Sequence, residues 1–284
     1  MLILSSVMHG KRELEIVIIS DLHLGTYGCH AKELLLYLKS ISPKKLILNG
    51  DIFDVWSYSK NYFPKSHLDV IRYILKMSGK GVEVIYITGN HDDVLRNFTN
   101  LYLGNIQLLD SYVLHIDNKT AWVFHGDVFD NTTKGMAKFF AVIGGKGYDL
   151  LILLNRCINW ILEKTGNRKA SFSKRIKNSV KKAVKWINNF ESTIAELAID
   201  QHYDYVVCGH IHHQEIKTIA TKKGNIVYMN SGDWVENLTS LEYSNKEWTI
   251  YKYEKIILPS ANEDIEEEKM IEFNTKILTQ NFYN

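Results

Sequence analysis

Short apolar runs rich in β-branched and aromatic residues recur along the chain, and each stops at a small polar block. Five runs share this character: residues 16–19, 46–48, 84–87, 122–124 and 205–208. Runs of this length and composition predict buried strands. Residues 30–40 and 66–78, which lie between the first three runs, place their leucines and isoleucines at helical spacing. This alternation of strand and helix predicts a parallel sheet flanked by helices.

The rest of the chain adds three further parts. Apolar runs near residues 226–229, 238–243 and 248–253 predict a second, more antiparallel sheet packed against the first. Between the fourth and fifth polar blocks the pattern is mostly helical, and we expect residues about 130–200 to form a cap beside the site. The expected organisation is one domain over residues 1–258 and an acidic tail over 259–284, to which we assign no role.

The polar blocks hold residue types that bind metal ions. In chain order they are Asp21-Leu22-His23, Gly50-Asp51, Gly89-Asn90-His91-Asp92, His125-Gly126-Asp127 and Gly209-His210-Ile211-His212. Open α/β sheets bind ligands at the carboxyl ends of their strands, so we expect these side chains to converge on one rim. Seven nitrogen and oxygen donors would meet there: Asp21, His23, Asp51, Asn90, His125, His210 and His212. Such a set predicts a two-metal phosphoesterase site.

The donors divide between two cations. Asp21 and His23 stand two residues apart after a strand and can reach the same ion, to which His212 can return. Asp51 has two carboxylate oxygens, one for each ion, and so can hold the ions about 3.5–4 Å apart for in-line displacement at phosphorus. The second ion is completed by Asn90, His125 and His210. A hydroxide that bridges the two ions near neutral pH would attack phosphorus, while the metals neutralise charge on the phosphoryl oxygens.

Neighbouring side chains receive supporting roles. His91 stands between the ligand Asn90 and Asp92, where it can give a proton or a hydrogen bond to the phosphoryl or leaving oxygen. We therefore assign it as a general acid or charge stabiliser. Asp54, Asp92 and Asp127 stand near ligands, and ligating imidazoles usually donate their second N–H to a carboxylate or carbonyl. We expect these three carboxylates to orient the imidazoles.

The composition limits which cellular compartment and which metal ions we expect. The three cysteines form neither a disulfide framework nor a CxxC pair, which favours a reducing compartment and argues against thiolate ligation. Nitrogen and oxygen donors suit Mn²⁺, Fe²⁺ or Zn²⁺, and we expect two divalent ions with Mn²⁺ as the first choice. No signal peptide is evident, and the apolar stretch 150–162 is shorter than the roughly 20 residues a membrane span requires. Histidines outside the blocks, His67 among them, are expected to be ordinary core or surface residues.

A basic segment within the expected cap bears on the substrate. Residues 164–190 contain nine Lys or Arg and no Asp or Glu, although the whole chain carries only +2. Its apolar residues fall at helical spacing, which predicts a basic amphipathic helix. There are two interpretations of such a helix. It packs its apolar face on the core and exposes its charged side to solvent, or it forms a surface that binds anionic lipid headgroups and substrate phosphate. Few aromatic residues interleave with the lysines, so nucleic-acid binding by stacking is disfavoured.

The full set of blocks resembles the motifs of the calcineurin-like metallophosphoesterases. The resemblance spans residues 14 to about 253 and rests on the five blocks together with Asp54. It implies an α/β fold, a two-sheet α/β/β/α sandwich with a helical insertion between the fourth and fifth motifs. It also implies a di-metal centre with Asp21, His23, Asp51 and His212 on one ion and Asp51, Asn90, His125 and His210 on the other.

A narrower resemblance is to the UDP-2,3-diacylglucosamine diphosphatases of lipid A synthesis. It is carried by SDLHLG at 20–25, GDIFDVW at 50–56 and SGDW at 231–234. Those enzymes release UMP and leave 2,3-diacylglucosamine 1-phosphate, and the insertion is similar to the lid by which they hold acyl chains. A loose match within it assigns Asn178 and Lys182 to the substrate diphosphate. The best-known members have Arg where this chain has His91, which leaves open a sister branch or another substrate.

We therefore expect a metal-dependent hydrolase of a nucleotide-linked lipid, in the cytoplasm and peripherally attached to the anionic inner face of the cell membrane. No protein partner is predicted. Two alternatives stay open: a metal-dependent phosphodiesterase acting on soluble nucleotides or nucleic acid, and a non-catalytic scaffold that keeps the metallophosphoesterase fold. The complete ligand set argues against the scaffold.

Overall fold

A computed structural model describes residues 10–55, 62–129, 187 and 189–254 of the chain. Most of the expected cap lies outside the described residues, as do Asn178, Lys182 and most of the basic segment. The expected acidic tail over 259–284 also lies outside them. The fold can therefore be compared with the sequence over both predicted sheets and all five polar blocks.

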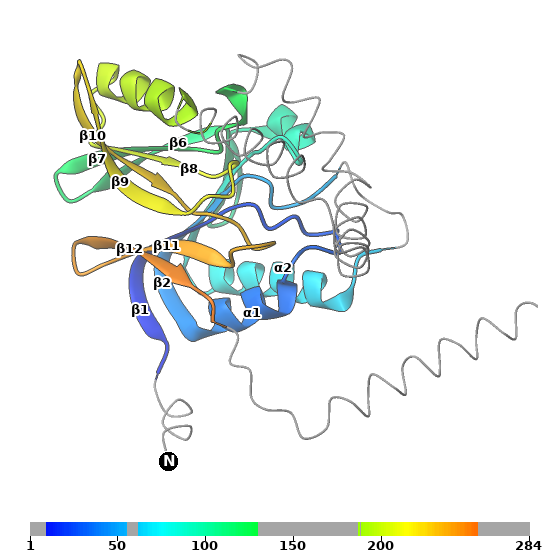
Figure 1. Cartoon of the computed structure of the whole chain (residues 1–284). Coiled ribbons are helices and arrows are strands. Elements are labelled where there is room, and N and C mark those ends of the chain that lie inside the picture. Colours follow the sequence, from blue (N-terminus) through cyan, green and yellow to red (C-terminus); the bar gives the residue numbers. More distant parts are fainter. Residues whose placement is uncertain (1–9, 56–61, 130–186, 188, 255–284) are drawn as a thin grey trace, which may run out of the picture. The chain divides into compact units, whose positions relative to one another are not determined.

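The first sheet has seven strands in the order β12-β11-β1-β2-β3-β5-β4. They are β1 (Arg12–Ile19), β2 (Ile41–Asn49), β3 (Glu83–Ile87), β4 (Leu101–Leu103), β5 (Ile106–Leu109), β11 (Thr239–Ser244) and β12 (Glu247–Lys252). Strands β1, β2, β3 and β5 run parallel, so their carboxyl ends share one edge. Helices α1 (Ala31–Ser40) and α2 (Lys65–Gly79) lie on the same side of this sheet (Figure 1).

The second sheet has five strands in the order β6-β7-β8-β10-β9. They are β6 (Ser111–Ile116), β7 (Lys119–Phe124), β8 (Tyr205–Cys208), β9 (Glu215–Thr221) and β10 (Gly224–Asn230). Strands β7, β8 and β10 run parallel. A helix over residues 189–200 packs on its outer face, where Phe190 and Ile194 contact the layer formed by Val206 and Tyr228.

The core lies between the two sheets. Ile18, Ile47 and Ile85 project from the first sheet toward Val123 and Val207 of the second, and all five are at most 1% exposed. Burying a side chain of this size contributes about 1.5–3 kcal/mol, so this layer accounts for much of the packing energy that joins the sheets. The order of layers, helix, sheet, sheet and helix, confirms the predicted α/β/β/α sandwich.

Some strands lie in a different sheet from the one the sequence predicted. The runs at 122–124 and 205–208 form β7 and β8 of the second sheet, whereas the runs at 238–243 and 248–253 form β11 and β12 of the first. The β11–β12 hairpin pairs antiparallel with the free edge of β1. Apolar runs predict burial but not pairing partners, because either sheet would bury them equally well.

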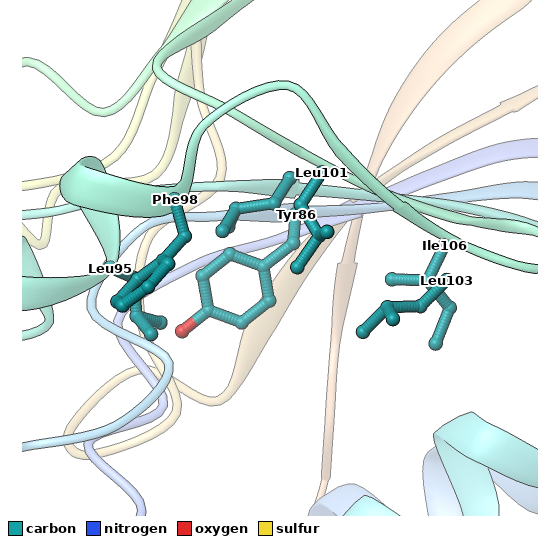
Figure 2. Close-up of a pocket in the computed structure, with 7 residues that line it drawn as sticks. Tyr86, Leu95, Phe98, Leu101, Leu103 and Ile106 are labelled. Atoms are coloured by element: carbon teal, nitrogen blue, oxygen red, sulfur yellow. The ribbon is translucent and has the colours of Figure 1, made fainter.

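A hollow on the outer face of the first sheet lies near its β4 edge. It has a volume of about 270 Å³ and is lined by Tyr86, Leu95, Phe98, Leu101, Leu103, Ile106 and Leu108 (Figure 2). Leu95 and Phe98 belong to the short 3-10 helix η2 (Asp93–Phe98), which follows the third polar block. The Tyr86 hydroxyl donates a hydrogen bond to Asp92 (2.6 Å), so the floor of the hollow is tied to that block.

Candidate metal centre

The five polar blocks meet where the carboxyl ends of β1, β2 and β3 face those of β7 and β8. Backbone hydrogen bonds join blocks that are far apart in the chain. Asp21 N–H donates to Gly50 O (3.0 Å), and Gly209 N–H donates to His125 O (2.9 Å). Residues from both sheets therefore form the rim. The sequence predicted that the polar blocks would meet at the edge of one sheet, whereas they meet where the edges of two sheets face each other.

The predicted ligands gather in two groups whose donor atoms lie within 4.8 Å of one another. Asp21, His23 and His212 form the first group, and Asp51, His125 and His210 form the second. The Asp51 Oδ2 atom lies 3.3 Å from His125 Nε2 and 3.9 Å from His23 Nε2, so Asp51 faces both groups.

Asn90 lies in the loop that runs directly past Asp51. The backbone N–H of the next residue, His91, donates a hydrogen bond to Asp51 Oδ1 (2.8 Å). The structure therefore brings Asn90 next to the carboxylate that we expect to share its ion.

Five of the seven candidate ligands have an unusual backbone conformation. Asp21, His23, Asp51, His210 and His212 all have positive φ, between 49° and 68°. Side chains other than glycine rarely adopt this left-handed region, which costs on the order of 1 kcal/mol or more per residue. Each of these residues lies two or four positions beyond the end of its strand, where the chain turns away from the sheet. Strain concentrated in this way is typical of functional sites.

Glycines let neighbouring blocks approach the ligands closely. A Cβ added to Gly209 would lie 2.7 Å from Asp21 Oδ2 and 2.7 Å from Ser20 Oγ, which is closer than real contacts allow. A Cβ on Gly89 would collide with Asp51 in the same way. The glycines before His210 and Asn90 are therefore required for packing around the ligand carboxylates.

Buried carboxylates and imidazoles dominate the electrostatics. Burial alone would raise the pKa of Asp21, but His212, whose Nε2 lies 3.2 Å from Asp21 Oδ1, outweighs it and lowers the pKa to about 2. Burial would lower the pKa of His212, yet Asp21 raises it to about 9. Burial likewise opposes protonation of His125, and Asp51 raises its pKa well above the usual value. The buried carboxylates therefore favour positive charge at the rim.

The donor atoms fit divalent cations. Asp21 Oδ1, His23 Nε2 and His125 Nε2 are buried, and each lies within 4 Å of another candidate ligand: His212 Nε2 for Asp21, and Asp51 Oδ2 for the two imidazoles. His125 Nδ1 lies 2.9 Å from the backbone oxygen of Asn49, which orients the ring and leaves Nε2 toward Asp51. Burying several carboxylates and imidazoles together is costly unless their charges and lone pairs are satisfied, and coordination to a cation would satisfy all three atoms.

His91 faces the same centre. Its Nδ1 lies 3.1 Å from Asp54 Oδ2, and its Nε2 lies 4.0 Å from Asp51 Oδ2. Asp54 is also 3.6 Å from His23 Nδ1, so it stands where a carboxylate orients both rings. Burial would lower the pKa of His91, but Asp54 and Asp51 outweigh it and raise the pKa. A raised pKa suits a group that donates a proton or a charged hydrogen bond.

Asp92 and Asp127 make contacts other than those expected. Asp92 accepts hydrogen bonds from Ile52 N–H (2.9 Å), Gly89 N–H (2.6 Å) and the Tyr86 hydroxyl, rather than from an imidazole. It satisfies buried backbone donors and so joins the Asp51 and Asn90 loops. Asp127 is bound by Arg96 Nη2 (2.6 Å), which ties η2 to the fourth block.

Three residues outside the predicted site hold the loops of the candidate ligands. The Asn230 side chain donates to Gly209 O (2.7 Å), and the Asn237 side chain donates to His212 O (2.8 Å). The backbone N–H of Trp234 donates to Asp21 O (3.1 Å). The SGDW segment was a signal for this region, whereas nothing in the sequence marks Asn237.

Comparison with known proteins places the chain in a family. The model of the calcineurin-like phosphoesterase family matches residues 14–214, which is well over half of the sequence. The chain belongs to this family. This is a family of metallophosphoesterase-type hydrolases that use divalent metal ions, which agrees with the His and Asp groups at the rim.

Several curated relatives carry the name UDP-2,3-diacylglucosamine hydrolase. The one from Aliivibrio fischeri is 24% identical over 245 residues, which cover 85% of this chain and 99% of that protein. The one from Neisseria gonorrhoeae is 29% identical over 140 residues, covering 48% of this chain and 58% of that relative. A solved archaeal phosphodiesterase is 14% identical and aligns over 84% of this chain and 98% of its own, with a TM-score of 0.40. Among the described residues, no helix combines the length and apolar character of a membrane span.

Proposed function

We propose that this chain is a di-metal phosphohydrolase that cleaves the diphosphate of UDP-2,3-diacylglucosamine to UMP and 2,3-diacylglucosamine 1-phosphate. One observation supports the hydrolase activity: two clusters of carboxylate and imidazole side chains meet at Asp51. The names of the curated relatives and the SDLHLG, GDIFDVW and SGDW segments support the substrate.

The chain's own residues would divide the work at the reacting phosphate. Asp21, His23 and His212 would hold one divalent ion, and Asn90, His125 and His210 the other, with Asp51 shared between them. When bound, two such ions, Mn²⁺ by first choice, supply an activated water and positive charge for the phosphoryl oxygens. His91, held by Asp54, would donate a proton or hydrogen bond to the leaving oxygen. Asn178 and Lys182 are proposed to contact the substrate diphosphate.

The cellular setting follows from the substrate. A diacylated sugar nucleotide resides in the bilayer, so we place the enzyme in the cytoplasm, peripherally attached to the inner face of the cell membrane. The nine cations of residues 164–190 support this placement, since each Lys or Arg near an anionic surface contributes about 1 kcal/mol.

A second candidate function is a phosphodiesterase that acts on soluble nucleotides or nucleic acid. It is favoured by one observation, the histidine at position 91, where the best-known diacylglucosamine diphosphatases have arginine. A guanidinium binds phosphate oxygens with a bidentate fork, whereas the imidazole of His91 can direct only its Nε2 toward the centre, so the two residues would hold a phosphoryl group differently.

The deciding experiment compares substrates with the Mn²⁺-loaded protein. UMP release from UDP-2,3-diacylglucosamine is measured beside release from UDP-N-acetylglucosamine, which lacks the acyl chains, and hydrolysis of bis-p-nitrophenyl phosphate. We expect turnover of the lipid to exceed that of both soluble compounds, and to vanish in an Asp51→Ala variant. Turnover of the soluble diester without the lipid would favour the second candidate, and no turnover of any substrate would favour a scaffold.

A further inference from the structure

Two tyrosines whose rings contact each other at a tilt lie next to the first ligand group, and the proposed chemistry does not use them. The ring centroids of Tyr27 and Tyr62 are 3.8 Å apart with an interplanar angle of 34°. Tyr27 is nevertheless 76% exposed, so much of its ring faces solvent. An aromatic ring that is supported on one side and open to solvent offers a surface on which another planar group can stack.

A tight turn places this pair beside the ligand His23. The backbone N–H and the hydroxyl of Thr26 both donate to His23 O, at 3.1 and 2.9 Å. The ends of such a four-residue turn lie within about 7 Å of each other, and Tyr27 is the next residue. The tyrosine pair therefore stands at the margin of the metal centre.

One buried imidazole holds both sides of the pair. His67, only 2% exposed, accepts a hydrogen bond from Gly25 N–H at its Nδ1 (2.9 Å). Its ring meets the rings of Tyr62 and Phe63 edge-on, at centroid distances of 6.1 and 5.7 Å. Burial lowers the pKa of His67, which keeps Nδ1 available as an acceptor. The segments that carry the two tyrosines are thus fixed before any ligand binds.

We propose that the Tyr27–Tyr62 pair binds the nucleobase of a nucleotide whose phosphate is held at the metal centre. This inference rests on the proposed function, because the phosphate-binding role of the centre is part of that proposal. A nucleotide carries its charged phosphate and its planar base on one sugar, and this rim presents a cation-binding group and an aromatic surface side by side. Stacking accepts any base, so the pair would favour nucleotides over other phosphates without selecting uracil.

The test measures equilibrium binding of UMP, ribose 5-phosphate and inorganic phosphate to the full-length, Mn²⁺-loaded protein. We expect UMP to bind more tightly than ribose 5-phosphate. Tyr27→Ala should weaken UMP binding about 10-fold or more, the usual effect of losing one base–aromatic stack, and leave the two baseless ligands unchanged. Tyr27→Phe, which keeps the ring, should bind UMP nearly as the parent does. Tyr102→Ala, at a tyrosine that is 66% exposed on β4, is the matched control and should have no effect.

Two results would overturn the proposal. The first is that Tyr27→Ala binds UMP as tightly as the parent does. The second is that Tyr27→Ala weakens the binding of inorganic phosphate as much as that of UMP, which would mean that Tyr27 only supports the His23 loop. Hydrolysis of the lipid substrate is assayed separately. If UMP binding depends on the Tyr27 ring but the lipid is not hydrolysed, the nucleobase site is supported and the proposed substrate is wrong. If the lipid is hydrolysed but UMP binding does not depend on the ring, the proposed substrate is supported and the nucleobase site is wrong.

Discussion

At the residue scale, buried charges decide the behaviour of the centre. Asp21 and Asp51 are at most 2% exposed, and each faces an imidazole within 3.3 Å. These carboxylates raise the pKa values of His212 and His125, so in the metal-free protein the imidazoles carry the compensating protons. A divalent ion would replace those protons, because a ligating histidine must be neutral.

Metal binding should therefore release protons. The pKa of His212 in the folded protein is about 9 against an ordinary value of 6.5. Protonation of His212 thus stabilises the metal-free fold fully below pH 6.5, and this contribution is lost as pH rises through about 9. We expect Mn²⁺ affinity to rise with pH across the same window. Calorimetric titration in two buffers of different ionisation enthalpy measures the protons released at neutral pH, and a count of zero would contradict this assignment.

His91 gives a second prediction at this scale. It faces Asp51 from 4.0 Å and is held by Asp54, an arrangement suited to a group that contacts the phosphate. His91→Ala should keep both bound ions and lower kcat by about 10²-fold. Elemental analysis beside steady-state kinetics separates the outcomes, with Asp93→Ala in the exposed start of η2 as the control. Loss of an ion from the His91 variant would make His91 a ligand instead.

At the element scale, the junctions between strands and turns build the site. Strands β1, β2 and β8 are each followed by a candidate ligand in the left-handed conformation, and a glycine beside the ligand block lets another strand end pass closely. Gly209 follows β8 and packs against Asp21, which follows β1 of the other sheet. Small residues at such positions therefore control how near the two sheets bring their ligands.

Gly209→Ala should damage both stability and metal binding. The added methyl would overlap Asp21 Oδ2 and Ser20, and overpacking of this kind costs about 1–3 kcal/mol. Thermal melts with and without Mn²⁺ should show a lower Tm and a smaller gain on adding metal. Gly79→Ala, where an added Cβ at the end of α2 meets nothing within 4 Å, is the control and should melt as the parent does. Equal melts for the two variants would show that the close approach at Gly209 is unimportant.

At the scale of the whole molecule, the proposed substrate requires a membrane surface. The basic segment 164–190 lies mostly outside the described residues, so this argument rests on its sequence. Several cations engaged at about 1 kcal/mol each would give reversible attachment that weakens with salt, since the Debye length shortens to about 8 Å at physiological ionic strength.

Reversing the charge of this segment should slow turnover of the lipid substrate without slowing hydrolysis at the metal centre. The variant replaces Lys174, Lys177, Lys181 and Lys182 by Glu, and we expect weaker cosedimentation with anionic vesicles and slower turnover of the lipid substrate. Hydrolysis of bis-p-nitrophenyl phosphate should stay near its original rate. A control with the same change in net charge replaces four exposed lysines elsewhere, Lys32, Lys76, Lys80 and Lys222. If both variants bind vesicles equally well, the segment is an ordinary solvated helix.

The sequence by itself determined the parts of this protein whose signals are local. Apolar runs of β-branched residues marked the strands that carry the blocks, so the α/β class could be predicted. Each donor stands within a few residues of its strand end, so local sequence was also enough to propose the seven candidate ligands. Helix bounds were also close, because the helical spacing at 30–40 and 66–78 is a property of contiguous residues.

Only the tertiary structure decided how distant segments combine. It placed β11 beside β1, with β12 at the edge next to β11, and it divided the rim between two sheets. It also turned Asp92 toward backbone donors of other loops, and it brought His67 to the base of the Tyr27–Tyr62 pair. Strand partners and such hydrogen bonds join residues from about 40 to more than 200 positions apart, so they depend on which buried surfaces and donors meet after folding, and no local pattern records that.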